Sequence, residues 1–262
     1  MRISVIMPVL NEERILGESL PHVLSLGLDE VIVVDGSSGD RTRDIVASLQ
    51  VRGSGYEARG LELFSDPAPR TSNLEPRTSN FEPSAPALTL LTTLPSRAGQ
   101  MNAGAAISQG EVLVFLHADT QLPLNARLQI EEALRDPAYV GGRFDVQFEP
   151  ATEWGRIISR MMNWRSRWSG IATGDQAIFV RRKCFERLGG FCDAPIMEDI
   201  DFTRRLKGAG RIAALRSTVV TSYRRWEHGG PVKTIALMWL LRGLYWLGIS
   251  PHILTRLYVH VR

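Results

Sequence analysis

Short apolar runs alternate with segments of helical spacing in the first half of the chain. The runs at 3–9, 31–34 and 112–116 are rich in branched apolar residues, as strands buried on both faces are. Between them, apolar residues recur every three or four positions, which predicts helices. Alternation at these lengths favours parallel pairing, so we expect an α/β domain whose mostly parallel central sheet is flanked by helices.

Length and charge limit the classes of protein to consider. The chain has 262 residues and is 44% hydrophobic, which is enough for a sizeable core. Its net charge of only +3 does not indicate a general nucleic-acid binder. No stretch of about 18 uncharged apolar residues predicts a transmembrane span. We therefore expect a cytoplasmic protein.

One segment breaks the alternation of strands and helices. Residues 66–87 are rich in Pro, Ser, Thr and Asn, and PRTSNLE (69–75) is followed at once by PRTSNFE (76–82). A proline in each copy argues against both helix and central strand. We interpret 66–87 as a disordered surface insertion.

Two carboxylates follow predicted strands directly. Asp35 ends the run at 31–34, and Asp119 follows the run at 112–116 through His117. Ligands bind at the carboxyl ends of strands in such sheets, and a carboxylate there can bind a ribose, a base or a divalent cation. Neither a G-x-G-x-x-G loop nor a P-loop lysine motif is present. A cation and basic side chains would therefore have to neutralise any bound phosphates.

Five motifs in order carry a resemblance to a known family. ISVIMPVLNEE, VIVVDGSSGDRT, RAGQMNAGAA, VLVFLHADT and MEDIDFTRRL resemble the successive motifs of family-2 glycosyltransferases. The resemblance extends from residue 3 to about 225, outside the 66–87 insertion. It implies a GT-A fold with a Rossmann-like sheet over 1–225, followed at 226–262 by a basic loop and an apolar helix. The residues of these motifs are most similar to those of a bacterial subgroup, some of whose members are assigned to arsenosugar biosynthesis.

The resemblance implies a nucleotide-sugar donor, usually a UDP-sugar, and a divalent cation, Mg²⁺ or Mn²⁺. Carried over by position, Asp35 would bind the base and Asp119 would be the metal ligand of the D-x-D motif. His117 stands where the family has the first aspartate of that motif, so its contact to ribose or sugar is in question. The other residues implied for the nucleotide-sugar site are Pro8, Asn11, Glu13 and Asn102.

The catalytic acids are expected in MEDIDFTRRL. Asp199 takes the position of the family's general base and Glu198 precedes it; acidic N-terminal capping of a helix is the competing interpretation. Asp175 and Gln176 are candidates to face the donor sugar and acceptor, or they form a turn. The final candidates come from SYRRWEHGG: Arg224 and Arg225 for the diphosphate, and His228 as a second metal ligand or a solvated loop histidine.

Two helices with apolar faces leave two interpretations open. In 154–168, Trp154, Ile157, Ile158, Met161, Trp164 and Trp168 share one face, and three arginines occupy another. The predicted helix at 232–247 is apolar almost all round. These faces would be buried in the core or in a homodimer interface, or they would contact the inner face of a membrane near a small-molecule or lipid acceptor.

The whole pattern predicts an inverting, metal-dependent hexosyltransferase. It would transfer a sugar from a nucleotide diphosphate to an acceptor hydroxyl, with Asp199 as the base. The alternatives are a non-catalytic nucleotide-sugar-binding protein and a sugar nucleotidyltransferase. The second would carry a glycine-rich loop after the first strand, where this chain has PVLNEERI.

Overall fold

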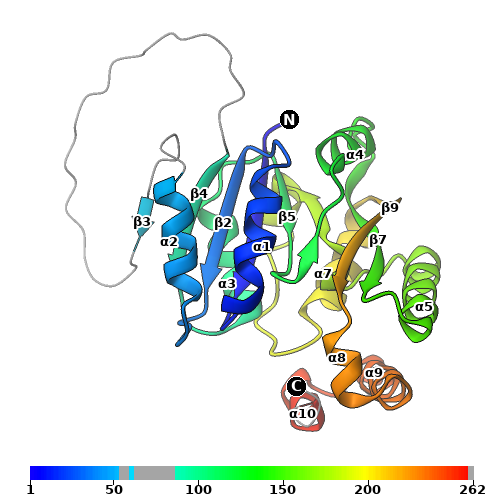
Figure 1. Ribbon diagram of the computed structural model, residues 1–262. Helices are drawn as coiled ribbons and strands as arrows, with labels where there is room; N and C mark the ends of the chain where they lie inside the picture. The colour runs from blue at the N-terminus through cyan, green and yellow to red at the C-terminus, as the bar shows by residue number, and fades with distance from the viewer. Residues whose placement is uncertain (53–58, 62–85, 259–262) are drawn as a thin grey trace.

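The computed structural model describes residues 1–52, 59–61 and 86–258 of the chain. Within these residues, one mixed sheet has the strand order β3-β4-β2-β1-β5-β8-β7-β9-β6 (Figure 1). Helices flank the sheet. The structure therefore has the α/β organisation that the alternating sequence pattern predicts.

The N-terminal half of the sheet is parallel. β1 (Ile3–Val9) lies between β2 (Glu30–Asp35) and β5 (Val112–Phe115). Beyond β2, β4 (Ala87–Thr92) and then β3 (Arg59–Leu61) continue the sheet. Because these strands run in one direction, the polar residues that follow β1, β2 and β5 reach the same edge.

Helices cover the two faces of this half because the strand residues alternate in direction. α1 (Glu13–Leu24) and α2 (Thr42–Arg52) contribute to the same buried cluster as Val5. α3 (Arg97–Ile107) packs on the other face, in the cluster that contains Ile6. Both sides of the central strands are thus fully desolvated.

The C-terminal half of the sheet changes direction. β8 (Ile178–Arg181) is antiparallel to β5, and β7 (Tyr139–Glu149) is antiparallel to β8. β9 (Arg211–Ser222) is parallel to β7, and the short β6 (Thr120–Gln121) pairs with β9 at the edge. β9 was not predicted from the sequence, because its arginines, serines and threonines form no apolar run. The helices of this half are α4 (Ala126–Ala133), α5 (Glu153–Ser169), α6 (Arg182–Arg187) and α7 (Glu198–Ala209), with the 3₁₀ turn η1 (Gly174–Gln176) before β8.

From Arg224 to Tyr258, the described residues form three helices rather than a loop and one helix. α8 (Arg224–Gly229) replaces the expected basic loop, α9 (Pro231–Trp246) is the expected apolar helix, and α10 (Pro251–Tyr258) was not predicted. They lie together at one end of the molecule (Figure 1). Within the described residues, no helix combines the length and hydropathy needed to cross a bilayer.

The predicted insertion at 66–87 lies outside the described residues except for its last two positions, 86 and 87. Ala87 belongs to β4, so the end of the predicted insertion overlaps the first residue of that strand.

α3 can approach the sheet closely because its buried face includes the small residues Ala98, Gly104 and Ala105. A Cβ atom at Gly104 would lie 2.6 Å from Ile6 Cγ2 and 2.9 Å from Val34 Cγ2, closer than packed carbons allow. The sequence of small residues in this helix therefore has a packing reason in addition to any role at the site.

We expect Gly104→Ala to lower the free energy of unfolding by about 1–3 kcal/mol, the usual cost of overpacking a core. Gly208→Ala is the matched control, because that exposed glycine lies near the end of α7 and an added Cβ would meet no atom within 4 Å. The control should be neutral or stabilise the protein by up to about 1 kcal/mol. Urea unfolding followed by circular dichroism compares them, and equal midpoints would contradict the packing argument.

Candidate active site

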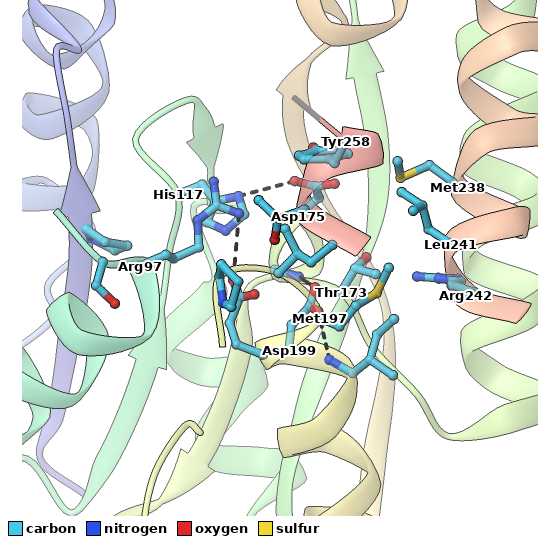
Figure 2. Close-up of a pocket in the computed structure, with 18 of the residues that line it drawn as sticks. Arg97, His117, Thr173, Asp175, Met197, Asp199, Met238, Leu241, Arg242 and Tyr258 are labelled. Carbon is cyan, nitrogen blue, oxygen red and sulfur yellow. Dashed lines mark hydrogen bonds and ion pairs between the residues drawn. The ribbon is translucent and has the colours of Figure 1, made fainter. Parts of the chain in front are cut away.

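A cavity of about 760 Å³ opens where β1 and β5 end. This volume is in the range of small-molecule sites. One side is formed by the loop after β1 and the start of α3, and a second by His117, η1 and the start of α7. The opposite side comes from α5, α8, α9 and α10 (Figure 2). Of the predicted site residues, Pro8, Asn11, His117, Asp175, Glu198 and Asp199 line the cavity.

The loops that follow β1 and β2 are joined by hydrogen bonds. The Asn11 backbone N–H donates to Ser38 Oγ over 2.9 Å, and Asn11 Oδ1 accepts from the Gly39 backbone N–H over 2.9 Å. The Glu13 carboxylate accepts from the Arg41 backbone N–H over 3.1 Å. Asn11 has φ 55°, a left-handed conformation that asparagine tolerates better than most residues. The predicted nucleoside-pocket residues Asn11 and Glu13 therefore also hold the two loops together.

Asp35 supports this loop pair from inside. Its side chain is fully buried, and its oxygens accept from the backbone N–H and the hydroxyl of Ser38. Asp35 is not among the described residues that line the cavity. In this arrangement it orders the loop, and direct contact with a base, as the resemblance implies, remains a prediction.

Gln100 is a site residue that was not predicted from the sequence. Its side-chain amide donates to the carbonyls of Val9, over 2.8 Å, and Val34, over 2.7 Å, so it joins the ends of β1 and β2. It is buried and lines the cavity. Its position inside the RAGQMNAGAA motif was the available signal.

An acidic pair shares one arginine beside the cavity. Arg224 Nη2 lies 3.7 Å from Asp119 Oδ2 and 3.7 Å from Glu12 Oε2. Burial raises the pKa of Glu12, which Arg224 opposes and the charge of Asp119 reinforces. Glu12 lines the cavity and was not predicted, whereas Asp119 lies just outside the described lining. The segments after β1 and β5 and the start of α8 thus bring two acidic groups and one basic group together.

His117 and Asp175 contact each other in the lining of the cavity, with His117 Nδ1 3.2 Å from Asp175 Oδ1 (Figure 2). The imidazole ring packs directly on Gly174, where a Cβ atom would lie 2.4 Å from His117 Nε2. The Gly174 backbone N–H donates to Asp199 Oδ2 over 2.9 Å. One turn of chain, η1, therefore positions the histidine and the predicted base.

Glu198 and Asp199 open α7 beside this turn. Asp199 Oδ1 also accepts from the Ile200 backbone N–H over 2.7 Å, so both its oxygens are oriented by the backbone. Burial, with the neighbouring charge of Asp199, raises the pKa of Glu198 to about 7. Arg97 Nη1, 3.9 Å from Glu198 Oε1, opposes the rise without cancelling it. The pair therefore holds one carboxyl group that titrates near neutral pH.

Two predicted residues have structural partners instead of cavity positions. Gln176 is fully buried, and its side chain accepts from the Thr173 backbone N–H over 3.3 Å and donates to the Phe144 carbonyl. Asn102 binds both backbone groups of Phe191, over 2.8 and 2.9 Å. Neither is among the described lining residues. Their interactions brace η1 and the loop before α7.

The third side of the cavity was not predicted. Met238, Leu241 and Arg242 of α9 face the carboxylates, together with Tyr258 of α10 (Figure 2). The sequence signal was only the apolar composition of α9, which does not tell what the helix packs against. The side chains of Arg225 and His228, both predicted for the site, lie outside what the structure describes.

Arg165 of α5 contributes a partly buried guanidinium group to the same cavity. Among the described residues, no group accepts a hydrogen bond from its buried Nε and Nη2 atoms. Burial lowers the pKa of its guanidinium, and the charges of Asp199 and Asp175 partly restore it. A buried donor without an acceptor is costly, which points to a ligand or to a purely electrostatic role.

A divalent cation fits this site only with help from a ligand. Among the described residues, no group of three or more His, Cys, Asp or Glu side chains could enclose a metal ion. Asp119 and Glu12 are close enough to affect one another. Magnesium-type ions bind proteins through one or two carboxylates plus substrate phosphates, so these two residues could hold a cation that a diphosphate completes.

Comparison with known proteins shows what the chain is similar to. Residues 4–59 match the sequence profile of Glycosyl transferase family 2. The chain is 26% identical over 230 residues to "Probable glycosyltransferase YdaM" of Bacillus subtilis (strain 168), covering 80% of this chain and 47% of the relative. The chain thus spans about half the length of this curated relative.

Solved structures share the fold. The mannosyltransferase PcManGT from Pyrobaculum calidifontis, in complex with GDP-Man and Mn²⁺, matches 84% of this chain and 56% of its own, with 20% identity and a TM-score of 0.58. S. aureus TarS 1–349 matches 86% of this chain and 61% of its own, with 16% identity and a TM-score of 0.56. TarS 1–349 in complex with UDP-GlcNAc matches with a TM-score of 0.54.

The fold is that of the GT-A glycosyltransferases. In sequence, residues 4–59 are similar to Glycosyl transferase family 2, and the Bacillus relative is a probable glycosyltransferase.

The raised pKa of Glu198 predicts how stability depends on pH. The folded protein binds this proton more tightly than the unfolded chain, so the contribution of Glu198 to stability is present below pH 4.5 and is lost as pH rises to about 7. Glu198→Gln should therefore unfold with a free energy about 1–3 kcal/mol above that of the native protein at pH 8, and with a similar value at pH 4. Urea titrations at several pH values measure this, and a difference independent of pH would refute it.

Arg165→Met should stabilise the fold by about 1–3 kcal/mol, because it removes buried donors that lack acceptors. Arg160→Met, on the exposed side of the same helix, is the control and should change stability little. Thermal unfolding of both variants provides the measurement. A lower melting temperature for Arg165→Met would show that the guanidinium is a net structural support.

Proposed function

We propose that this protein transfers a sugar from a nucleotide diphosphate sugar to an acceptor hydroxyl, with inversion and with Asp199 as the general base. One observation carries the proposal: oriented carboxylates at the start of α7 share a cavity with the ends of β1 and β5. The family resemblance adds the UDP donor, the divalent cation and inversion.

In this scheme, one side of the cavity accepts the proton of the acceptor, and the other side stabilises the leaving diphosphate. The acceptor oxygen attacks the anomeric carbon, the bond from that carbon to the diphosphate breaks, and the acceptor proton passes to Asp199. The backbone N–H groups of Gly174 and Ile200 keep the Asp199 carboxylate in one orientation. Each carboxylate oxygen retains a lone pair for the proton.

The leaving diphosphate needs positive charge. Arg97 lines the cavity, and Arg224 lies beside Glu12 at its edge. A cation held by Asp119 and Glu12 would supply further Lewis-acid stabilisation when bound. We infer that Arg224 moves between these carboxylates and the diphosphate. Arg225 stays a candidate for binding the diphosphate, and His228 stays a candidate for binding the metal. Membership of the arsenosugar-related subgroup stays a prediction.

Substitutions at the two carboxylates test the base directly. Asp199→Asn should lower kcat by about 10²- to 10⁴-fold and leave donor affinity nearly unchanged, because the amide cannot take the acceptor proton. Glu198→Gln is the matched variant and should retain most activity. If instead Glu198→Gln abolishes turnover, and the native rate falls as Glu198 is protonated below its pKa of about 7, then Glu198 is the base.

A donor screen tests the function itself. Thermal shift with UDP- and GDP-sugars, with and without Mn²⁺, should identify one stabilising donor, since a ligand of the folded state raises stability by mass action. Asp119→Asn should remove the Mn²⁺-dependent part of that shift. A donor that binds without ever releasing its nucleotide, with any acceptor tested, would favour the non-catalytic alternative.

A further inference from the structure

Tryptophan is distributed unusually in this protein. Five of the six tryptophans are exposed by 43% to 80% of their surface, and only Trp226 is buried, at 8%. The exposed ones are confined to two helices: Trp154, Trp164 and Trp168 on α5, and Trp239 and Trp246 on α9. Large exposed apolar groups gathered in this way mark an interaction surface.

Each helix presents these residues as a continuous stripe. On α5, the exposed residues Trp154, Ile157, Met161, Trp164 and Trp168 recur at spacings of three and four. Ile158, predicted on this same face, is instead buried. The structure therefore separates a core-facing side of α5 from a solvent-facing apolar stripe, which sequence periodicity could not do.

The stripe on α9 follows the same pattern. Val232, Trp239 and Trp246 are spaced by seven residues, and Leu240 and Leu247 lie next to them; all are exposed by more than half. The two stripes meet at the cavity, because Met161 of the first and Trp239 of the second both line it. We call the two stripes together the tryptophan surface.

Charge identifies the partner. α5 and the segment 231–258 together carry Lys and Arg at seven positions and a single acidic residue, Glu153; two of the seven, Arg165 and Arg242, line the cavity. Arg156 and Arg160 occupy the strip of α5 beside the tryptophans and are exposed, whereas Arg167 on the same strip is paired with Asp145. A second copy of the chain would bring this basic surface against itself, which is repulsive, whereas an anionic bilayer would attract it.

We propose that the tryptophan surface docks on an anionic lipid bilayer. The indole rings would lie at the headgroup level, and the flanking arginines would reach the lipid phosphates, as in interfacial helices. The mouth of the cavity would then lie at the membrane, within reach of a lipid-borne acceptor hydroxyl. The docking depends on the surface alone, and only the last step rests on the proposed function.

Vesicle flotation tests the docking without any activity measurement. The full chain should float with vesicles of phosphatidylcholine and phosphatidylglycerol, and far less with phosphatidylcholine alone or in high salt. Trp164→Ser with Trp239→Ser should weaken vesicle binding at least about tenfold. Arg156→Gln with Arg160→Gln should also weaken it about tenfold or more, since each basic residue near an anionic surface contributes about 1 kcal/mol.

The matched control is Leu124→Ser with Leu128→Ser. These leucines are exposed by 81% and 66%, but lie at the other end of the molecule, at α4 (Figure 1). This variant should bind vesicles as the native chain does. Brominated lipids provide a measurement that needs no variant, because they should quench the fluorescence of exposed tryptophans. Absence of flotation and of quenching would overturn the proposal, as would a native dimer that the tryptophan substitutions convert to a monomer.

Discussion

The two hydrogen bonds donated by the Gln100 amide are the constraint on which the site depends. They bind the carbonyls of Val9 and Val34 near the ends of β1 and β2, where the Val9 carbonyl also accepts from the Gly36 backbone N–H over 2.9 Å. With the strand ends joined, the loops that follow them can bind one another through Asn11 and Ser38. Removing this amide would take one hydrogen bond from each of these carbonyls and remove the side-chain link between the two strand ends.

The cavity concentrates charge that the fold balances only in part. Arg224 lies between two carboxylates, Arg97 lies close to a third, and Arg165 has buried guanidinium nitrogens that find no acceptor among the described residues. Such an arrangement costs stability in the free protein. It suits a site whose ligand carries negative charge, because the basic groups are then already in place and need no reorganisation.

The C-terminal helices link the cavity to the outer surface. One side of α9 faces the carboxylates through Leu241, while the opposite side exposes Trp246. α5 is divided in the same way between Arg165 at the cavity and Trp168 in solvent. Both helices therefore contribute side chains to the cavity and to the tryptophan surface.

The sequence by itself determined the α/β class and the central parallel strands β1, β2 and β5, because strands buried on both faces consist of uninterrupted apolar residues. It also pointed to Asp119, Glu198 and Asp199, since short motifs place them at strand or helix ends. It could not assign β9, whose polar residues pair at a half-exposed edge, or separate Ile158 from its exposed neighbours on α5.

Only the tertiary structure decided which polar groups share a cavity. Asp35 and Gln176 were predicted at the site, yet Asp35 is buried beneath its own loop and Gln176 caps η1, while Gln100 and Arg165 line the cavity. The spacing of these residues along the chain does not indicate which of them line the cavity. The partner of a side chain depends on the direction in which it leaves its element and on what packs there, and both are set by contacts distant in sequence.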